Sequence, residues 1–317
     1  MLSRLADSLF WLGRYLERAE DLSRILDVHV QGLTGAPTEK ELAWTVDIST
    51  ILSQPESWAS TSSELIWKLA IERSESASVA YALDKAWQNA RVARDMIPLE
   101  LWEALNRTHF QLETWLSDSE GFSPHGFLGW VKDRVAVASG IANSAMMRDE
   151  GWYFFTLGQL LERSDIGLRL MKVKHFSFWP DAVVLLRCFS GHEAFLHVYR
   201  RPPTDATAVL FLLRNREFPR SVLSSLMQIQ RCLEAIVTGE QPRSDGLWIS
   251  EPKVAAFAGL GMGVAALRYT SDDDVISDAR TFIEGLQDAV SQVDEFVLER
   301  FFSAYSDQRF YHPQMGV

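Results

Sequence analysis

The sequence predicts an all-α protein, and the prediction begins with the spacing of its apolar residues. Through most of the 317-residue chain, apolar residues recur every three or four positions, as they do along one face of an α-helix. No segment keeps the strict alternation of apolar and polar residues that is typical of a half-buried strand. We therefore expect a single helical bundle domain over residues 1–317.

A second observation is an internal similarity between two segments 145 positions apart. Phe10 to Val28 reads FWLGRYLERAEDLSRILDV, and Phe155 to Val173 reads FTLGQLLERSDIGLRLMKV. Apolar positions alone could coincide in any two helices, but a glycine and a Glu-Arg pair coincide as well. These positions are Gly13 and Gly158, Glu17 and Glu162, and Arg18 and Arg163. We predict two pseudo-repeats, with halves of about 1–140 and 141–317, whose Glu-Arg helices pack side by side.

Turn-forming residues divide the first half into six helices. Pro37 and Pro55 lie in breaks that helices do not cross, and Pro98 fits the first turn of the fifth helix. Serine or threonine precedes the third and fourth helices and can cap them. The cap candidates are Thr61 or Ser62 and Ser76 or Ser78. The predicted helices are Leu2–His29, Leu42–Leu52, Glu64–Ser74, Val79–Ile97, Leu99–Leu116 and Leu128–Arg148.

The second half is predicted to follow the same plan. Ser221 opens a helix as Ser78 does, 143 positions earlier, and three glycines between Gly259 and Gly263 permit close packing of the helix that holds them. The predicted helices are Asp149–Lys174, Asp181–Tyr199, Thr204–Leu213, Ser221–Val237, Val254–Tyr269 and Val275–Tyr305.

The composition argues against several classes of partner. The net charge of −11 disfavours nucleic acid and anionic membrane, because their phosphates require a basic surface. No stretch approaches the ~20 consecutive apolar residues of a membrane span, and charged residues interrupt the N-terminal region where a signal peptide would be apolar. The two cysteines, Cys188 and Cys232, lack metal-ligand spacing. We expect a cytoplasmic protein with reduced thiols.

The charged residues of the two repeated helices allow two interpretations. At about 100° per residue, Glu17, Glu20 and Arg24 lie together beside the apolar stripe, and Arg18 lies on its other flank. The equivalent residues of the second helix are Glu162, Asp165 and Arg169. They could form solvated salt-bridge ladders, each pair contributing roughly 0.2–0.5 kcal/mol. They could instead face each other across a pseudo-twofold and form a polar pocket inside the bundle.

Motifs for covalent, metal or nucleotide chemistry are missing. We find no nucleophile elbow, zinc-type histidine pair or phosphate-binding loop, and His192 and His197 are spaced one residue too far apart for a zinc protease. The acidic pairs of the repeated helices resemble carboxylate metal sites, but those sites take a histidine from a Glu-x-x-His motif that this chain lacks. We expect neither a metal nor a cofactor.

Four segments together resemble the bacterial Alpha-E family, an all-helical group named for its Glu-Arg motif. The segments are LSRLADSLFWLGRYLERAED from Leu2, QNARVARDMIPLELWEALN from Gln88, GQLLERSD from Gly158 and EFPRSV from Glu217. Members are found beside, or fused to, a circularly permuted ATP-grasp ligase and a transglutaminase-like peptidase, and some lie near a proteasome-like peptidase. The resemblance implies a part in forming or processing a peptide or amide bond.

The resemblance and the helical spacing of the charged residues together indicate which residues to examine. The candidate ligand-binding residues are Arg14, Glu17, Arg18, Glu20, Arg24, Arg91, Arg94, Glu162, Arg163, Asp165 and Arg169. Gln159 stands where the first repeat has Arg14, so strict twofold symmetry is in doubt. Two functions stay open: an accessory binding or scaffolding partner of the ATP-grasp ligase, or an enzyme that transfers acyl or peptidyl groups. In the second, Glu17 or Glu162 would be the general base, with a pKa raised by burial.

Overall fold

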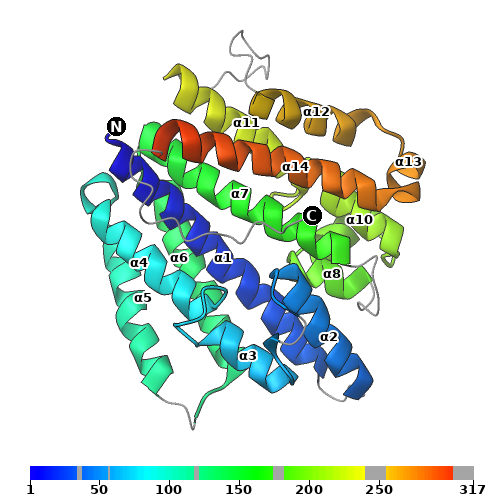
Figure 1. The fold of residues 1–317 in the computed structure, drawn as a ribbon, viewed down its shortest axis with the longest axis horizontal. Coiled ribbons are helices and arrows are strands. Elements are labelled where there is room, and N and C mark those ends of the chain that lie inside the picture. Colours follow the sequence, from blue (N-terminus) through cyan, green and yellow to red (C-terminus); the bar gives the residue numbers. More distant parts are fainter. Residues whose placement is uncertain (34–37, 56–57, 118–120, 174–181, 240–254, 303–317) are drawn as a thin grey trace.

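The computed structural model describes residues 1–33, 38–55, 58–117, 121–173, 182–239 and 255–302, and these residues form α-helices with no strand among them (Figure 1). The all-α prediction is therefore confirmed. The helices of the first half are α1 Ser3–Leu33, α2 Thr38–Ile51, α3 Ser62–Ala70, α4 Val79–Val92, α5 Leu99–Ser117 and α6 Pro124–Ala145. Those of the second half are α7 Glu150–Val173, α8 Ala182–Cys188, α9 His192–Tyr199, α10 Asp205–Arg214, α11 Val222–Thr238, α12 Ala255–Tyr269, α13 Asp272–Ser277 and α14 Ala279–Val297.

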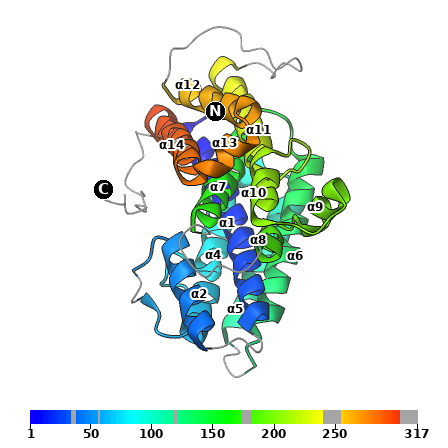
Figure 2. The same ribbon diagram turned by 90° about the vertical axis from the view of Figure 1, so that its right-hand side faces the viewer.

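The two Glu-Arg helices, α1 and α7, lie side by side and run parallel through the middle of the bundle (Figures 1 and 2). The equivalent glycines are the reason they can approach so closely. A Cβ atom on Gly13 would lie 2.1 Å from the carbonyl oxygen of Phe155, and one on Gly158 would lie 2.1 Å from that of Phe10. The side-by-side packing expected from the sequence is confirmed.

The helices around this pair correspond between the two halves. In the first half α1 packs on α4 and α6, and α5 joins those two; in the second half α7 packs on α11 and α14, and α12 joins those two. The halves also exchange helices, since α8 packs on α1 and α2 packs on α7. An origin of these halves as repeats of one unit stays a prediction.

Helix starts follow the expected capping chemistry. Thr61, Ser78 and Ser221 each accept a hydrogen bond from the backbone N–H three residues later, at the first turns of α3, α4 and α11. The α6 helix begins four residues before the predicted Leu128, because Ser123 caps it and proline occupies its first turn. The caps are confirmed, and this boundary was wrong.

Two predicted long helices are each interrupted. The Asp181–Tyr199 segment is divided between α8 and α9 at Ser190, whose φ of 52° is left-handed. The Val275–Tyr305 segment begins inside α13, and α14 starts afresh after Asp278, which caps it. Periodicity missed both breaks because the apolar spacing continues across them. Asp181, Lys174, Val254 and residues 303–305 lie outside the described residues.

The described helices place two further limits on the fold. None of them is both long and apolar enough to cross a bilayer. Among the same residues, no group of three or more histidine, cysteine, aspartate or glutamate side chains is arranged to hold a metal ion.

Candidate functional site

The Glu-Arg motifs of α1 and α7 form reciprocal ion pairs. Both carboxylate oxygens of Glu17 accept hydrogen bonds from Arg163, from Nε at 2.6 Å and from Nη2 at 2.8 Å. Glu162 accepts in the same way from Arg18, whose Nε lies 2.5 Å and Nη2 3.1 Å away. Each motif therefore supplies the acid to one pair and the base to the other. Such two-pronged guanidinium–carboxylate pairs are among the strong, directional hydrogen bonds of proteins.

A second arginine donates a hydrogen bond to the glutamate of each pair. Arg220, at the turn before α11, donates to Glu17 at 3.1 Å and to Asp21 at 2.6 Å. Arg14 donates to Glu162 at 2.8 Å and also binds Asp294 of α14. The two ion pairs are not symmetric in this second arginine, because Gln159 occupies the position of α7 that is equivalent to Arg14.

Glu17 and Glu162 are only 1% and 2% exposed. The interpretation of these two acids as part of a solvated ladder is therefore wrong. They belong to a buried cluster, which we call the Glu-Arg cluster and define by the residues that form it. Its members are Arg14, Glu17, Arg18, Glu20, Asp21, Arg24, Glu162, Arg163, Asp165, Arg169, Arg220 and Asp294.

The less buried end of the cluster is also reciprocal. Arg24 pairs with Glu20 and Arg169 pairs with Asp165, each four residues along one helix, as the sequence predicted. Each arginine then donates to a serine that follows a helix of the opposite half. Arg24 reaches Ser190 after α8, and Arg169 reaches Ser53 after α2 at 2.7 Å. Both serines have a left-handed backbone, with φ of 52° and 58°.

Burial and neighbouring charges shift several pKa values within the cluster. Burial raises the pKa of Asp21 to about 8 although Arg220 opposes the shift, and burial likewise raises the pKa of Asp294 against Arg14. Burial alone would also raise the pKa of Glu20, but the positive charges of Arg220 and Arg24 outweigh burial and hold that pKa at about 2. Burial lowers the pKa of Arg14, but Asp294 and Glu162 more than offset it, so the net pKa is raised.

Not all candidate residues belong to this cluster. Arg91 and Arg94 are exposed near the end of α4, where their guanidinium groups lie over the rings of Trp87 and Trp102, 5.1 and 5.6 Å from the ring centroids. Of the candidate ligand-binding residues, these two arginines therefore lie apart from the buried glutamates.

Two members of the Glu-Arg cluster, Asp21 and Arg220, were not among the candidate residues of the sequence analysis. Asp21 lies one turn after Glu17 on the same helix and could have been included by spacing. Arg220 lies in the EFPRSV segment, but nothing local indicates which acid it would reach 203 positions away.

The geometry limits the chemistry of the two central glutamates. Each carboxylate accepts three hydrogen bonds from guanidinium groups: Glu17 from Arg163 and Arg220, and Glu162 from Arg14 and Arg18. A general base needs a lone pair within hydrogen-bonding reach of its substrate. The arrangement therefore suits a rigid internal tie between helices better than proton transfer.

Comparison with known proteins agrees with this geometry. A family model described as a predicted alpha-helical domain with a conserved ER motif matches residues 1–302. No curated protein and no solved structure matches the chain. The match covers nearly the whole sequence, so the chain belongs to the Alpha-E family.

Proposed function

We propose that the chain is a non-catalytic helical scaffold that binds a circularly permuted ATP-grasp ligase in a system that forms peptide or amide bonds. The observation that carries the scaffold role is the enclosure of Glu17 and Glu162, which are almost fully buried and each bound by two arginines. In this role the Glu-Arg cluster fixes how the helices are arranged, and the outer surfaces bind partners.

The choice of partner rests on the family. The Alpha-E resemblance supports an ATP-grasp ligase first, and a transglutaminase-like or proteasome-like peptidase as a further partner. A protein partner also suits the charge, because a net charge of −11 gives no general attraction to nucleic acid or anionic lipid.

A binding assay tests the proposal. The purified chain, immobilised at physiological salt, should retain a circularly permuted ATP-grasp ligase from the same organism and should change that ligase's kinetics. Recovery of no ligase, together with unchanged ligase kinetics, would contradict the scaffold role.

A pair of conservative variants separates the scaffold from an enzyme. Glu17→Gln and Glu162→Gln keep the size of each side chain but remove any general base. If the chain only scaffolds, ligase binding and ligase activity of the double variant should both follow its folded fraction. A folded double variant that binds the ligase normally but has lost product formation would support catalysis by these glutamates.

A further inference from the structure

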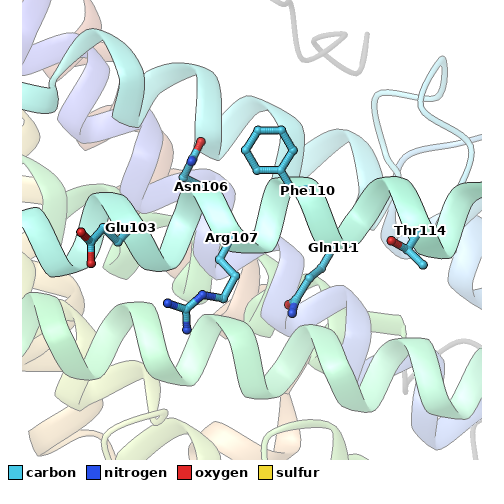
Figure 3. A pocket seen from close by; sticks show the side chains of 6 residues that line it. All are labelled: Glu103, Asn106, Arg107, Phe110, Gln111 and Thr114. Atoms are coloured by element: carbon cyan, nitrogen blue, oxygen red, sulfur yellow. The ribbon is translucent and has the colours of Figure 1, made fainter.

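The outward face of α5 carries two large apolar side chains in contact with solvent. Leu99 is 58% exposed and Phe110 is 64% exposed. Glu103 and Arg107 lie between them and are also exposed. At about 100° per residue these four side chains fall within roughly a quarter of the helix circumference, so they form one face. Figure 3 shows three of them, Glu103, Arg107 and Phe110, among the side chains of α5 that line a pocket.

Side chains on the neighbouring helices hold this face in place. The indole of Trp87 on α4 donates to Asn106 at 3.1 Å, and the indole of Trp130 on α6 donates to Gln111 at 3.3 Å. The Trp87 ring also stacks on His109, with 3.9 Å between the ring centroids. A surface fixed in this way loses little conformational entropy when it binds.

Glu103 and Arg107 carry the two charges of this face. Neither forms an ion pair or a hydrogen bond with another of the described residues, although they lie four positions apart on one helix. An acid and a base that are both exposed and both unpaired leave this face able to neutralise a partner that carries the same two charges in reverse order.

We propose that this face binds the same face of a second copy of the chain, with the two α5 helices antiparallel across a twofold axis. Such an axis exchanges residues that are equally distant from it along the helix. Leu99 and Phe110 are centred on position 104.5, and Glu103 and Arg107 on position 105. A single axis therefore places Leu99 against Phe110 of the other copy and Glu103 against Arg107 of the other copy.

The apolar pair and the charged pair are centred on nearly the same position of α5, which favours a second copy over an unrelated protein. An isologous interface must be complementary to itself, and here the apolar pair and the charged pair satisfy that condition about the same point. Glu103 lies near the middle of this face, where a polar residue fixes the register of paired helices at a cost in affinity. The dimer should therefore depend on protein concentration.

Charge reversal provides the test, read by sedimentation velocity over a range of concentrations. The wild-type chain should sediment as a dimer. Glu103→Arg and Arg107→Glu should each raise the dimer dissociation constant at least about tenfold, because each places like charges opposite each other. An equimolar mixture of the two variants should form a heterodimer, and the double variant Glu103→Arg/Arg107→Glu should form a homodimer again.

An apolar variant and a distant one complete the design. Phe110→Asp should be monomeric with an unchanged thermal melt, since the ring is mostly exposed. Met262→Asp, on α12 and 73% exposed, should leave the dimer intact. A wild-type monomer at about 100 μM, which excludes all but very weak association, would overturn the proposal. So would α5 variants that dimerise normally, a mixture that fails to associate, or loss of the dimer in Met262→Asp.

Discussion

At Glu17, a carboxylate that is almost completely removed from water is held by Arg163 and Arg220. Removing one partner of a buried ion pair leaves the remaining charges without compensation, which typically costs several kcal/mol. Glu17→Ala should therefore lower the free energy of unfolding by about 3–5 kcal/mol, measured by urea denaturation.

The control is a glutamate whose ion pairs face solvent. Glu284 pairs with Lys172 at 2.9 Å and Arg280 at 3.2 Å, and its side chain is 38% exposed. Glu284→Ala should cause only a small loss of stability, because exposed pairs contribute little. A loss of that small size for Glu17→Ala as well would show that the Glu-Arg cluster contributes little to folding.

His29 makes the stability depend on pH in a defined direction. It is buried against Trp44, its Nε2 has no hydrogen-bond partner among the described residues, and burial lowers its pKa from 6.5 to about 4. Above pH 6.5 the imidazole is neutral in both states, so the full stability is present. As the pH falls from 6.5 towards 4, only the unfolded chain takes up the proton at His29, so the contribution of this residue to stability should fall by up to about 1.4 kcal/mol per pH unit. The raised pKa of Asp21 acts in the opposite direction.

His29→Phe keeps an aromatic ring and removes the titrating group. Urea denaturation at several pH values between 4 and 7 should therefore show that the wild type loses stability relative to the variant as the pH falls. An equally steep dependence in His29→Phe would assign the effect to other groups.

At the scale of the helix, Gly13 and Gly158 set the distance between α1 and α7. An added Cβ at Gly13 would lie 2.1 Å from a backbone oxygen, which no side-chain rotation can relieve, so the helices would have to separate. Gly13→Ala should lower the free energy of unfolding by more than the 1–3 kcal/mol that is usual for overpacking, as a thermal melt would show.

Gly140, in the middle of α6, is the matched control because nothing lies within 4 Å of a Cβ added there. Gly140→Ala should stabilise the protein by up to about 1 kcal/mol through helix propensity alone. If Gly13→Ala were equally harmless, the close approach of α1 and α7 would not be required for folding.

How far the sequence could predict the fold depends on the range of the interaction involved. Gly13 and Glu17 recur in α7 at the same spacing, so the paired helices and their central acids followed from the sequence. The division of the Asp181–Tyr199 segment at Ser190 did not, because one left-handed residue leaves the apolar period unchanged. Asp294 could not be predicted as a partner of Arg14 either, since 280 positions separate them and only tertiary packing brings them together.

At the scale of the whole molecule, neither half holds its own Glu-Arg helix in isolation. The first half supplies α1, but α7, α8 and the final π-helical turn Leu298–Phe302 cover it from the second half. Asp294 and Arg220, also from the second half, neutralise Arg14 and Glu17. A fragment of residues 1–140 would therefore expose the apolar stripe of α1. It would also leave Arg14 and Glu17, which are buried and paired in the full chain, without their partners, and both effects oppose folding.

We accordingly expect the full chain to unfold in one cooperative transition and the 1–140 fragment not to fold alone. In calorimetry, the van't Hoff enthalpy of the full chain should equal the calorimetric enthalpy, which is the criterion for a two-state transition. The fragment should show weak helical circular dichroism and no cooperative melt. Two separate transitions in the full chain, or a cooperatively folded fragment, would mean that each half is a domain in its own right. The contacts of α1 argue against that outcome, because its most closely packed partner is α7 and that helix belongs to the other half.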